Sequence, residues 1–317
     1  MKTSPLLALA ASVPSAVAVF KGFNYGALDL SGNVKSQASF EGDFNAAKNL
    51  QGPKVPYNSA RLYTSIQGGT TNGPIAAIPA AISTGTNLLL GIWASAGQAG
   101  IDNEIAAIQS GISQYGSAFT NLIAGIGVGS EDVYRITPLG VASNAGTGAT
   151  PDQIQSYITQ VKNAFPNLGK PVGHVDTYNV WSNSSGWMNG VKGVSDFIGM
   201  NAFPYYEDTK PNSIENANAT FWGDYDATTG TSNGKPVWIT ETGWPTSGPV
   251  DGQAVPSVDN AEAYYQDVAC HAFGSGINTW WYTLQDSSSS ASVPSFGVVP
   301  DGATPPPTTP KYNLRCP

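Results

Sequence analysis

The sequence predicts a single-domain α/β protein with the (β/α)8, or TIM, barrel fold. Three observations support this prediction: eight short apolar runs follow one another, each connection is long enough for a crossover, and no change in composition marks a second domain. The runs are 22–26, 59–63, 87–93, 122–129, 171–176, 197–201, 235–241 and 278–282. Because they are apolar throughout rather than alternating, they fit parallel strands buried on both faces. An open doubly wound sheet remains the alternative.

Helices are expected between the runs, and two of them have clear end signals. Thr150 is a good N-cap, and Pro151 follows it at the first helical position. Apolar residues then recur at helical spacing as far as Phe165, before proline and glycine stop the run. Asp259 is expected to cap a second helix, which covers 261–273.

The two ends of the chain differ from its middle. Residues 1–18 have the form of a secretory signal peptide: Lys2, an apolar middle at 6–11, and Ala16-Val17-Ala18 as the cleavage site. A Pro/Thr-rich tail at 304–317 closes the chain, and no hydrophobic segment follows it, so no membrane anchor is expected. We therefore expect a secreted, extracellular or cell-wall protein whose folded domain is 19–317.

Two further features fit an exported protein. The only two cysteines, Cys270 and Cys316, can pair in an oxidising compartment and pin the tail. Asn183 and Asn218 begin Asn-x-Ser/Thr sequons and are candidate glycosylation sites.

Composition and missing motifs exclude several functions. The formal charge of -8 and the absence of a basic cluster make nucleic acid an unfavourable partner. No phosphate-binding P-loop and no dinucleotide fingerprint occur, so no nucleotide cofactor is expected. His174 and Asp176 could hold a metal, but no third ligand is suggested nearby, and a polar pair at a strand end is preferred. We therefore expect neither cofactor nor metal.

Acid–base chemistry must then rest on carboxylates. Glu131, Asp176 and Glu241 directly end apolar runs, and Asp286 lies just beyond the last run. In a barrel the carboxyl ends of the strands share one mouth, where active sites of this fold lie. Glu131 ends the fourth run and Glu241 the seventh, which places them on opposite sides of that mouth. Two facing carboxylates are what the hydrolysis of a glycosidic bond requires.

Aromatic residues at the same strand ends support a sugar substrate, because flat rings stack on the apolar faces of sugars. The set comprises Trp93, Trp181, Trp244, Trp280, Trp281, Tyr63, Tyr178, Tyr205 and Tyr206. Core packing remains the alternative for each ring taken singly. Arg61, in the second run, needs a carboxylate partner; it either orients an acidic active-site residue or forms a structural salt bridge in the barrel.

The chain resembles the family 17 glycoside hydrolases, in particular their fungal cell-wall β-1,3-glucanase and glucanosyltransferase branch. The matching segments are 22–26, 60–63, 128–135, 199–206, 240–245 and 280–282, which include Ser-Glu-Asp-Val-Tyr-Arg and Thr-Glu-Thr-Gly-Trp-Pro. The resemblance implies a TIM barrel that acts on β-1,3-glucan by retaining double displacement. It also implies Glu131 as general acid/base, Glu241 as nucleophile, and Arg61, Tyr63, Asn201, Tyr205 and Trp281 as cleft residues.

Some site residues rest on position rather than on the resemblance. Asp176 and Tyr178 are expected in the cleft from their strand-end positions, and Trp244 on the glucan-facing rim. The resemblance bears on Ser130, which stands where the wider clan of retaining barrel hydrolases usually carries the Asn that hydrogen-bonds the sugar 2-hydroxyl. Serine is similar to the fungal branch, but its reach is shorter.

The mechanism also makes two demands on the acidic pair. It requires a raised pKa at Glu131 and carboxyls roughly 5–5.5 Å apart. Transfer to another glucan, catalysed by the same two residues, is the first alternative, and an inactive glucan-binding wall protein is the second. Neither endo nor exo attack is favoured, and we expect a monomer.

Overall fold

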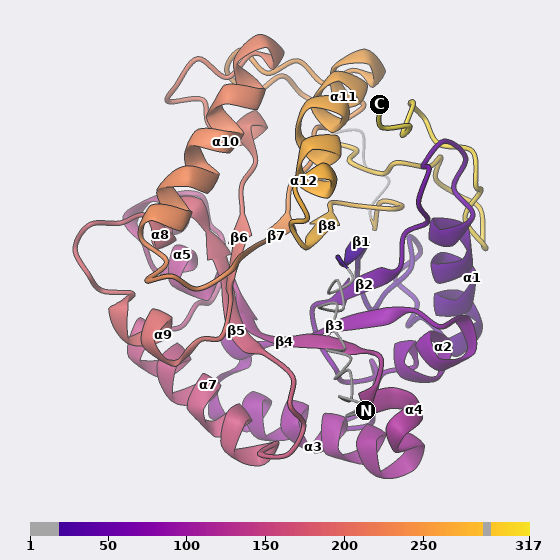
Figure 1. The fold of residues 1–317 in the computed structure, drawn as a ribbon, viewed down its shortest axis with the longest axis vertical. Coiled ribbons are helices and arrows are strands. Elements are labelled where there is room, and N and C mark those ends of the chain that lie inside the picture. Colours follow the sequence, from indigo (N-terminus) through magenta and orange to yellow (C-terminus); the bar gives the residue numbers. More distant parts are fainter. Residues whose placement is uncertain (1–18, 288–292) are drawn as a thin grey trace, which may run out of the picture.

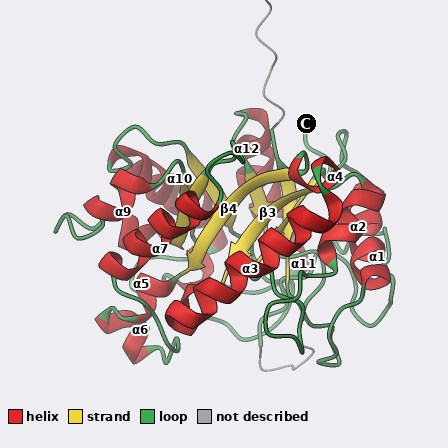
Figure 2. Ribbon diagram, turned by 90° about the horizontal axis from the view of Figure 1, so that it is seen from below, coloured by secondary structure: helices red, strands yellow, loops and turns green. Residues whose placement is uncertain are grey.

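The computed structural model describes residues 19–287 and 293–317 and is a closed barrel of eight parallel strands inside a ring of helices (Figure 1). Each strand pairs with the next, and β8 closes the barrel by pairing with β1. Seen from the side, the strands form an inner layer with helices packed outside it (Figure 2). The predicted single-domain (β/α)8 barrel is confirmed, and the open sheet is excluded. The expected signal peptide, 1–18, lies outside the described residues.

All eight predicted runs form strands, with small differences at their ends. The strands are β1 (Lys21–Tyr25), β2 (Ser59–Leu62), β3 (Asn87–Ile92), β4 (Ile123–Ser130), β5 (Val172–Thr177), β6 (Ile198–Asn201), β7 (Val237–Glu241) and β8 (Thr279–Trp281). Apart from the first residues of β1 and β3 and the last of β5, every strand residue is buried. This burial on both faces explains why the runs lack alternation.

The helices fill the connections. Their bounds are α1 (Gln37–Lys48), α2 (Ala77–Thr84), η1 (Ala94–Ala96), α3 (Gly97–Tyr115), α4 (Ser117–Thr120), α5 (Asp132–Arg135), α6 (Pro138–Ala142), α7 (Pro151–Ala164), α8 (Tyr178–Trp181), α9 (Asn189–Val194), η2 (Pro204–Tyr206), α10 (Ile214–Gly230), α11 (Val258–Tyr264), η3 (Tyr265–Ala269) and α12 (Cys270–Gly274). Within the described residues, none of them is long and apolar enough to cross a membrane.

The two helices with clear end signals are present, and one cap differs from the prediction. Thr150 caps α7 through a reciprocal pair of hydrogen bonds with Gln153, as its sequence indicates. At α11 the expected cap, Asp259, is wrong: the Ser257 hydroxyl accepts the bond from the Asn260 amide. Asp259 instead lies in the first helical turn, where its charge still favours the helix dipole.

A layer of side chains closes the barrel interior below its mouth. Leu89, Ala124, Phe197, Trp238 and Trp280 belong to or adjoin five different strands yet form one cluster, so they meet inside the barrel. The rings of Phe197 and Trp238 stack with centroids 3.9 Å apart. The Trp280 indole donates to the Ser59 hydroxyl, which satisfies its buried N–H. This interior cluster is the floor of the site described below.

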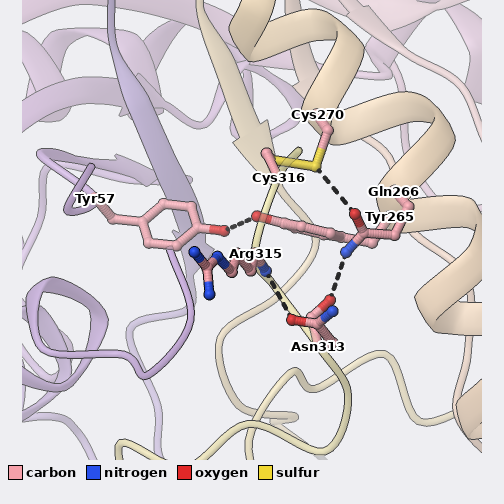
Figure 3. The surroundings of a disulfide bond; sticks show 7 residues. All are labelled: Tyr57, Tyr265, Gln266, Cys270, Asn313, Arg315 and Cys316. Carbon is pink, nitrogen blue, oxygen red and sulfur yellow. Dashed lines mark hydrogen bonds between the residues drawn. A yellow bond between two sulfur atoms is a disulfide. The ribbon is translucent and has the colours of Figure 1, made fainter. Parts of the chain in front are cut away.

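The C-terminal tail is fixed to the outside of the barrel. Cys316 forms the predicted disulfide with Cys270 at the start of α12 (Figure 3). On the preceding turn, the Gln266 amide donates to the backbone carbonyl of Asn313. The tail therefore cannot separate from α12 without the loss of a covalent bond. Both sequon residues, Asn183 and Asn218, are exposed, and their glycosylation stays a prediction.

Candidate active site

The two predicted catalytic carboxylates lie at the carboxyl ends of their strands. Glu241 is the last residue of β7, and Glu131 directly follows β4. Glu131 adopts a left-handed backbone conformation, with φ of 62°, which turns the chain from β4 into α5. Its amide donates to the carbonyl of Val175, so the turn is attached to β5. A left-handed conformation is costly for a residue other than glycine and persists only where surrounding contacts hold it.

Arg61 connects the two sides of the site. Its guanidinium forms an ion pair with Glu241 at 2.5 Å and donates to the Ser130 hydroxyl at 3.0 Å and to the Asn24 carbonyl oxygen at 2.7 Å. Arg61 is only 2% exposed, so these interactions act in a medium of low dielectric. The arginine therefore fixes one oxygen of Glu241, and its role in an active site stays a prediction.

Asn201, at the end of β6, makes the matching contact with Glu131. Its side-chain NH2 donates to Glu131 Oε1 at 2.9 Å, while its carbonyl oxygen accepts from the Thr240 hydroxyl at 2.7 Å. In this orientation both the NH2 and the carbonyl oxygen of the Asn201 side chain have a hydrogen-bond partner. Through Asn201 and Thr240, the contacts of Glu131 reach the strand that ends in Glu241.

The surroundings of Glu131 favour its protonated form. Burial and the charge of Glu241, with a smaller contribution from Asp176, raise the pKa of Glu131 to about 7, against the opposing hydrogen bond from Asn201. Its ordinary value is 4.5. Glu241, in contrast, is paired with a buried guanidinium. The site thus combines a carboxyl that keeps its proton near neutral pH with a carboxylate held by a cation.

Tyr63 lies beside Glu241 and borders a cavity that neither Glu241 nor Glu131 lines. The Arg61 guanidinium lies 4.9 Å from the centre of the Tyr63 ring. Burial and the charge of Glu241 raise the pKa of the Tyr63 hydroxyl, which therefore remains a hydrogen-bond donor. Tyr63 also lines a cavity of about 170 Å³ with Asn24 and Tyr282, between the loops that follow β1 and β8. Within the described residues, no group of three or more His, Cys, Asp or Glu side chains is placed to hold a metal ion.

Three aromatic residues expected in the cleft or on its rim are instead part of the core. Trp281 is fully buried and packs against Tyr264 and Tyr265 outside the barrel, because successive residues of β8 alternate between its faces. Trp244 is 1% exposed, and its indole donates to the Val255 carbonyl. Tyr205 is also fully buried, and its hydroxyl donates to the Pro249 carbonyl. The expectation that these rings face the sugar is wrong for this structure.

Trp181 and Trp280 are buried as well, whereas Trp93 and Tyr206 are exposed at strand ends, by 38% and 49% respectively. Tyr178 is half-buried at the start of α8, and its hydroxyl donates to Glu207. Of the predicted aromatic set, the rings accessible to a ligand are therefore Tyr63, Trp93, Tyr178 and Tyr206.

Asp176 does not line the cleft either. It is fully buried, and its carboxylate accepts from the amides of Val133 and Tyr134 in α5 and from His174. Its strand-end position suggested a cleft residue, but the side chain lies behind Glu131, where it is bonded to the backbone of α5. Asn24 is the residue that sequence reasoning missed. It lies in a segment that carries the family resemblance, and only the three-dimensional contact with Arg61 shows its role.

Comparison with known proteins decides the family. Residues 22–298 match the BtgE/BtgC glycoside hydrolase domain. The chain belongs to this family. It is a glycoside hydrolase, as the resemblance to family 17 implied. It is 48% identical over its whole length to the "Probable glucan endo-1,3-beta-glucosidase eglC" of Aspergillus oryzae, of which it covers 67%.

Two further similarities place this glycoside hydrolase among related proteins. It is 31% identical to the "Glucan 1,3-beta-glucosidase" of Schizosaccharomyces pombe, over 72% of this chain and 67% of that protein. Among solved structures, the family 17 beta-1,3-glucanosyltransferase from Rhizomucor miehei has a TM-score of 0.74 and 28% identity, over 94% of this chain and 98% of that chain. An active-site mutant of that Rhizomucor enzyme has been solved in complex with laminaritriose.

Proposed function

We propose that this glycoside hydrolase cleaves β-1,3-glucan by double displacement with retention of configuration. The observation that carries the proposal is the asymmetry of its two carboxyls: Glu241 is paired with Arg61, while the pKa of Glu131 is raised to about 7. Retaining hydrolysis needs one ionised nucleophile and one protonated acid at the start of the cycle. The names of the relatives, which refer to 1,3-beta-glucosidases, support the substrate.

The proposed first step forms a covalent intermediate. A Glu241 oxygen attacks the anomeric carbon while Glu131 gives its proton to the glycosidic oxygen, and the bond to the leaving sugar breaks. Arg61 holds the nucleophile in place, because its guanidinium also contacts Asn24 and Ser130. Although Ser130 accepts from Arg61, its hydroxyl proton remains available to a sugar oxygen, so Ser130 can still contribute to binding.

In the second step Glu131 acts as a base. It takes a proton from water, the water oxygen displaces Glu241 from the anomeric carbon, and the starting configuration is restored. If a glucan hydroxyl takes the place of water, the product is a longer glucan. This transfer is the second candidate function, and the similarity to the Rhizomucor miehei glucanosyltransferase favours it.

Labelled laminari-oligosaccharides test the proposal directly. We expect shorter products with the β-configuration in early NMR spectra, and products longer than the substrate if transfer competes. Glu241→Ala is expected to lose activity and to regain turnover with azide, giving a glycosyl azide of inverted configuration. An inverted product from the wild type, or full activity in Glu241→Ala, contradicts the mechanism. An inactive wild type that still binds glucan would identify a binding protein.

The cellular site is also a proposal. The predicted signal peptide at 1–18 and the Cys270–Cys316 disulfide support secretion, because disulfides persist in oxidising compartments. Mass spectrometry of protein from culture medium and from cell walls tests it. A mature N-terminus after residue 18 is expected, and an uncleaved intracellular chain is the contrary result.

A further inference from the structure

A buried charged pair lies directly behind Glu131 and takes no part in the two displacement steps. His174 and Asp176 project from the same side of β5, two residues apart, and both are fully buried. His174 Nε2 is 2.9 Å from Asp176 Oδ2, and His174 Nδ1 is 2.6 Å from the Val128 carbonyl oxygen. We call these two residues the His174–Asp176 pair.

The contacts of His174 determine its charge. A carbonyl oxygen can only accept, so Nδ1 must carry a proton. Nε2 faces a carboxylate that already accepts from the amides of Val133, Tyr134 and Thr177, so Nε2 donates as well. A ring that donates from both nitrogens is an imidazolium. Burial alone lowers the pKa of His174, but the hydrogen bond and charge of Asp176 outweigh this effect and raise it.

The pair is bonded to the turn that presents Glu131. Asp176 accepts from the amides of Val133 at 3.0 Å and Tyr134 at 3.3 Å, which are the second and third residues after Glu131. The amide of Glu131 itself donates to Val175, which lies between the two members of the pair. The left-handed conformation of Glu131 is thus held by three hydrogen bonds to consecutive residues of β5.

A second buried carboxylate holds the turn from the other side. Asp132 accepts from the Ser130 amide at 2.7 Å and from the Ser95 hydroxyl. There is no room for a side chain at residue 129: a Cβ on Gly129 would lie 2.3 Å from Asp132 Oδ2 and 3.0 Å from His174 Cε1. The His174 ring and the Asp132 carboxylate therefore meet at Gly129, beneath the turn.

We propose that His174 and Asp176 are positioning residues for the general acid: they aim Glu131 at the glycosidic oxygen by holding the backbone of residues 131–134. The proposal rests on the assignment of Glu131 under Proposed function. The charged groups that act on Glu131 are Asp176 on β5, Glu241 on β7 and Arg135 on α5, with Asp132 and His174 one layer behind. In this arrangement Asp176 has two effects, since it fixes the turn and its charge favours the protonated acid.

A purely structural pair would stabilise the fold without favouring one step of the reaction. The two roles differ in their dependence on the leaving group. A sugar alkoxide is a poor leaving group and needs a proton from Glu131, whereas 2,4-dinitrophenolate departs without one. A misplaced acid therefore slows cleavage of a β-1,3 bond and spares a dinitrophenyl glycoside. A general loss of structure slows both.

The test compares Asp176→Asn with the wild type on laminaripentaose and on 2,4-dinitrophenyl β-laminaribioside. The quantity measured is kcat/KM, because it reports only the steps up to formation of the covalent intermediate. We expect Asp176→Asn to lose on the order of 10²-fold on laminaripentaose and less than about threefold on the dinitrophenyl substrate. Because the variant lacks the negative charge, the basic limb of its pH profile should also move to lower pH.

Glu104→Gln provides a matched control. Glu104 is 2% exposed and, like Asp176, holds backbone amides with its carboxylate, those of Ser65 and Trp93, but it has no bond to the Glu131 turn. We expect Glu104→Gln to change kcat/KM equally for both substrates. Equal losses in Asp176→Asn as well, or no loss in it, would overturn the proposal. A wild type that cleaves neither substrate would instead refute the proposed function.

The charge of His174 can be tested in the wild type, so the result does not depend on whether a variant folds. In ¹⁵N NMR of the wild type at pH 7, we expect protons on both ring nitrogens of His174. A neutral ring would overturn the assignment of His174 as an imidazolium, whether or not Asp176→Asn folds. His174→Gln keeps a donor toward Asp176 but lacks the charge, and we expect it to show the same selective loss on laminaripentaose as Asp176→Asn, to a smaller extent.

Discussion

Glu131 is predicted to make the fold less stable as the pH rises. A carboxyl whose pKa is higher in the folded chain than in the unfolded chain binds more protons when folded between the two values. The free energy of unfolding therefore falls as the pH rises through that interval. For Glu131 the interval runs from 4.5 to about 7. Above pH 7 the ionised side chain costs at most about 3 kcal/mol, at about 1.4 kcal/mol per pKa unit.

Glu131→Gln removes this charge and keeps the size and polarity of the side chain. At pH 8 the variant should be more stable than the wild type by up to about 3 kcal/mol, or roughly 5 °C in Tm for a chain of this length. At pH 4 the two proteins should differ little, because Glu131 is then protonated in both folded and unfolded chains. Activity on β-1,3-glucan should be lost at every pH.

Thermal unfolding of both proteins, followed by circular dichroism at several pH values, checks this prediction. Titrating groups that do not interact with Glu131 are common to the two chains, so their contributions cancel in the difference. Glu215→Gln, at an exposed site in the first turn of α10, is the control and should show no stabilisation at pH 8. If Glu131→Gln is no more stable than the wild type at pH 8, or gains equally at pH 4 and pH 8, the reasoning is refuted.

Three further outcomes follow from the site and the tail. Asn201→Ala removes the hydrogen bond that favours the ionised form of Glu131. The basic limb of the kcat/KM profile, expected near pH 7, should therefore move up by about one pH unit. A downward shift would contradict the effect assigned to this hydrogen bond. Arg61→Met leaves Glu241 buried without its cation. This variant should lose about 3–5 kcal/mol of unfolding free energy, measured with urea, and all activity, whereas Arg61→Lys should keep part of the stability. A stable, active Arg61→Met would show that the ion pair is not what holds Glu241 in place. Replacing Cys270 and Cys316 with serine opens a loop with a sequence separation of 46. The free energy of unfolding should fall by up to about 4 kcal/mol, because the unfolded chain gains entropy, and kcat/KM at 25 °C should be unchanged. Lower activity in the folded variant would show that the tail affects the site.

The parts that the sequence predicts well have local signatures. A strand buried on both faces leaves a continuous apolar run, and eight such runs in alternation allow few folds besides a barrel. The residue that ends each run then has a known place, at the mouth. That is why Glu131 and Glu241 could be assigned to one site although they are far apart in sequence.

The errors concern the direction in which a side chain points at, or just beyond, the end of a strand. Trp281 is the last residue of β8 and Trp244 lies in the loop after β7. Strand alternation directs the first ring into the core, and loop packing directs the second there. Asp176 ends a run as Glu131 does, but it points behind the neighbouring turn rather than into the mouth. A shift of one residue along the chain decides whether a side chain points into the core or into the mouth of the barrel. The direction is set by packing and hydrogen-bond partners from other elements, and a single sequence does not identify these partners.

The interior cluster of Phe197, Trp238 and Trp280 has a consequence for the fate of the proposed covalent intermediate. Because these packed rings fill the barrel below the site, they block access from underneath to a sugar attached to Glu241. Water and an incoming sugar must use the same opening, from which the first product has just departed. The choice between hydrolysis and transfer is then a competition for one entrance, and the residence time of the departing chain sets how soon either competitor can enter.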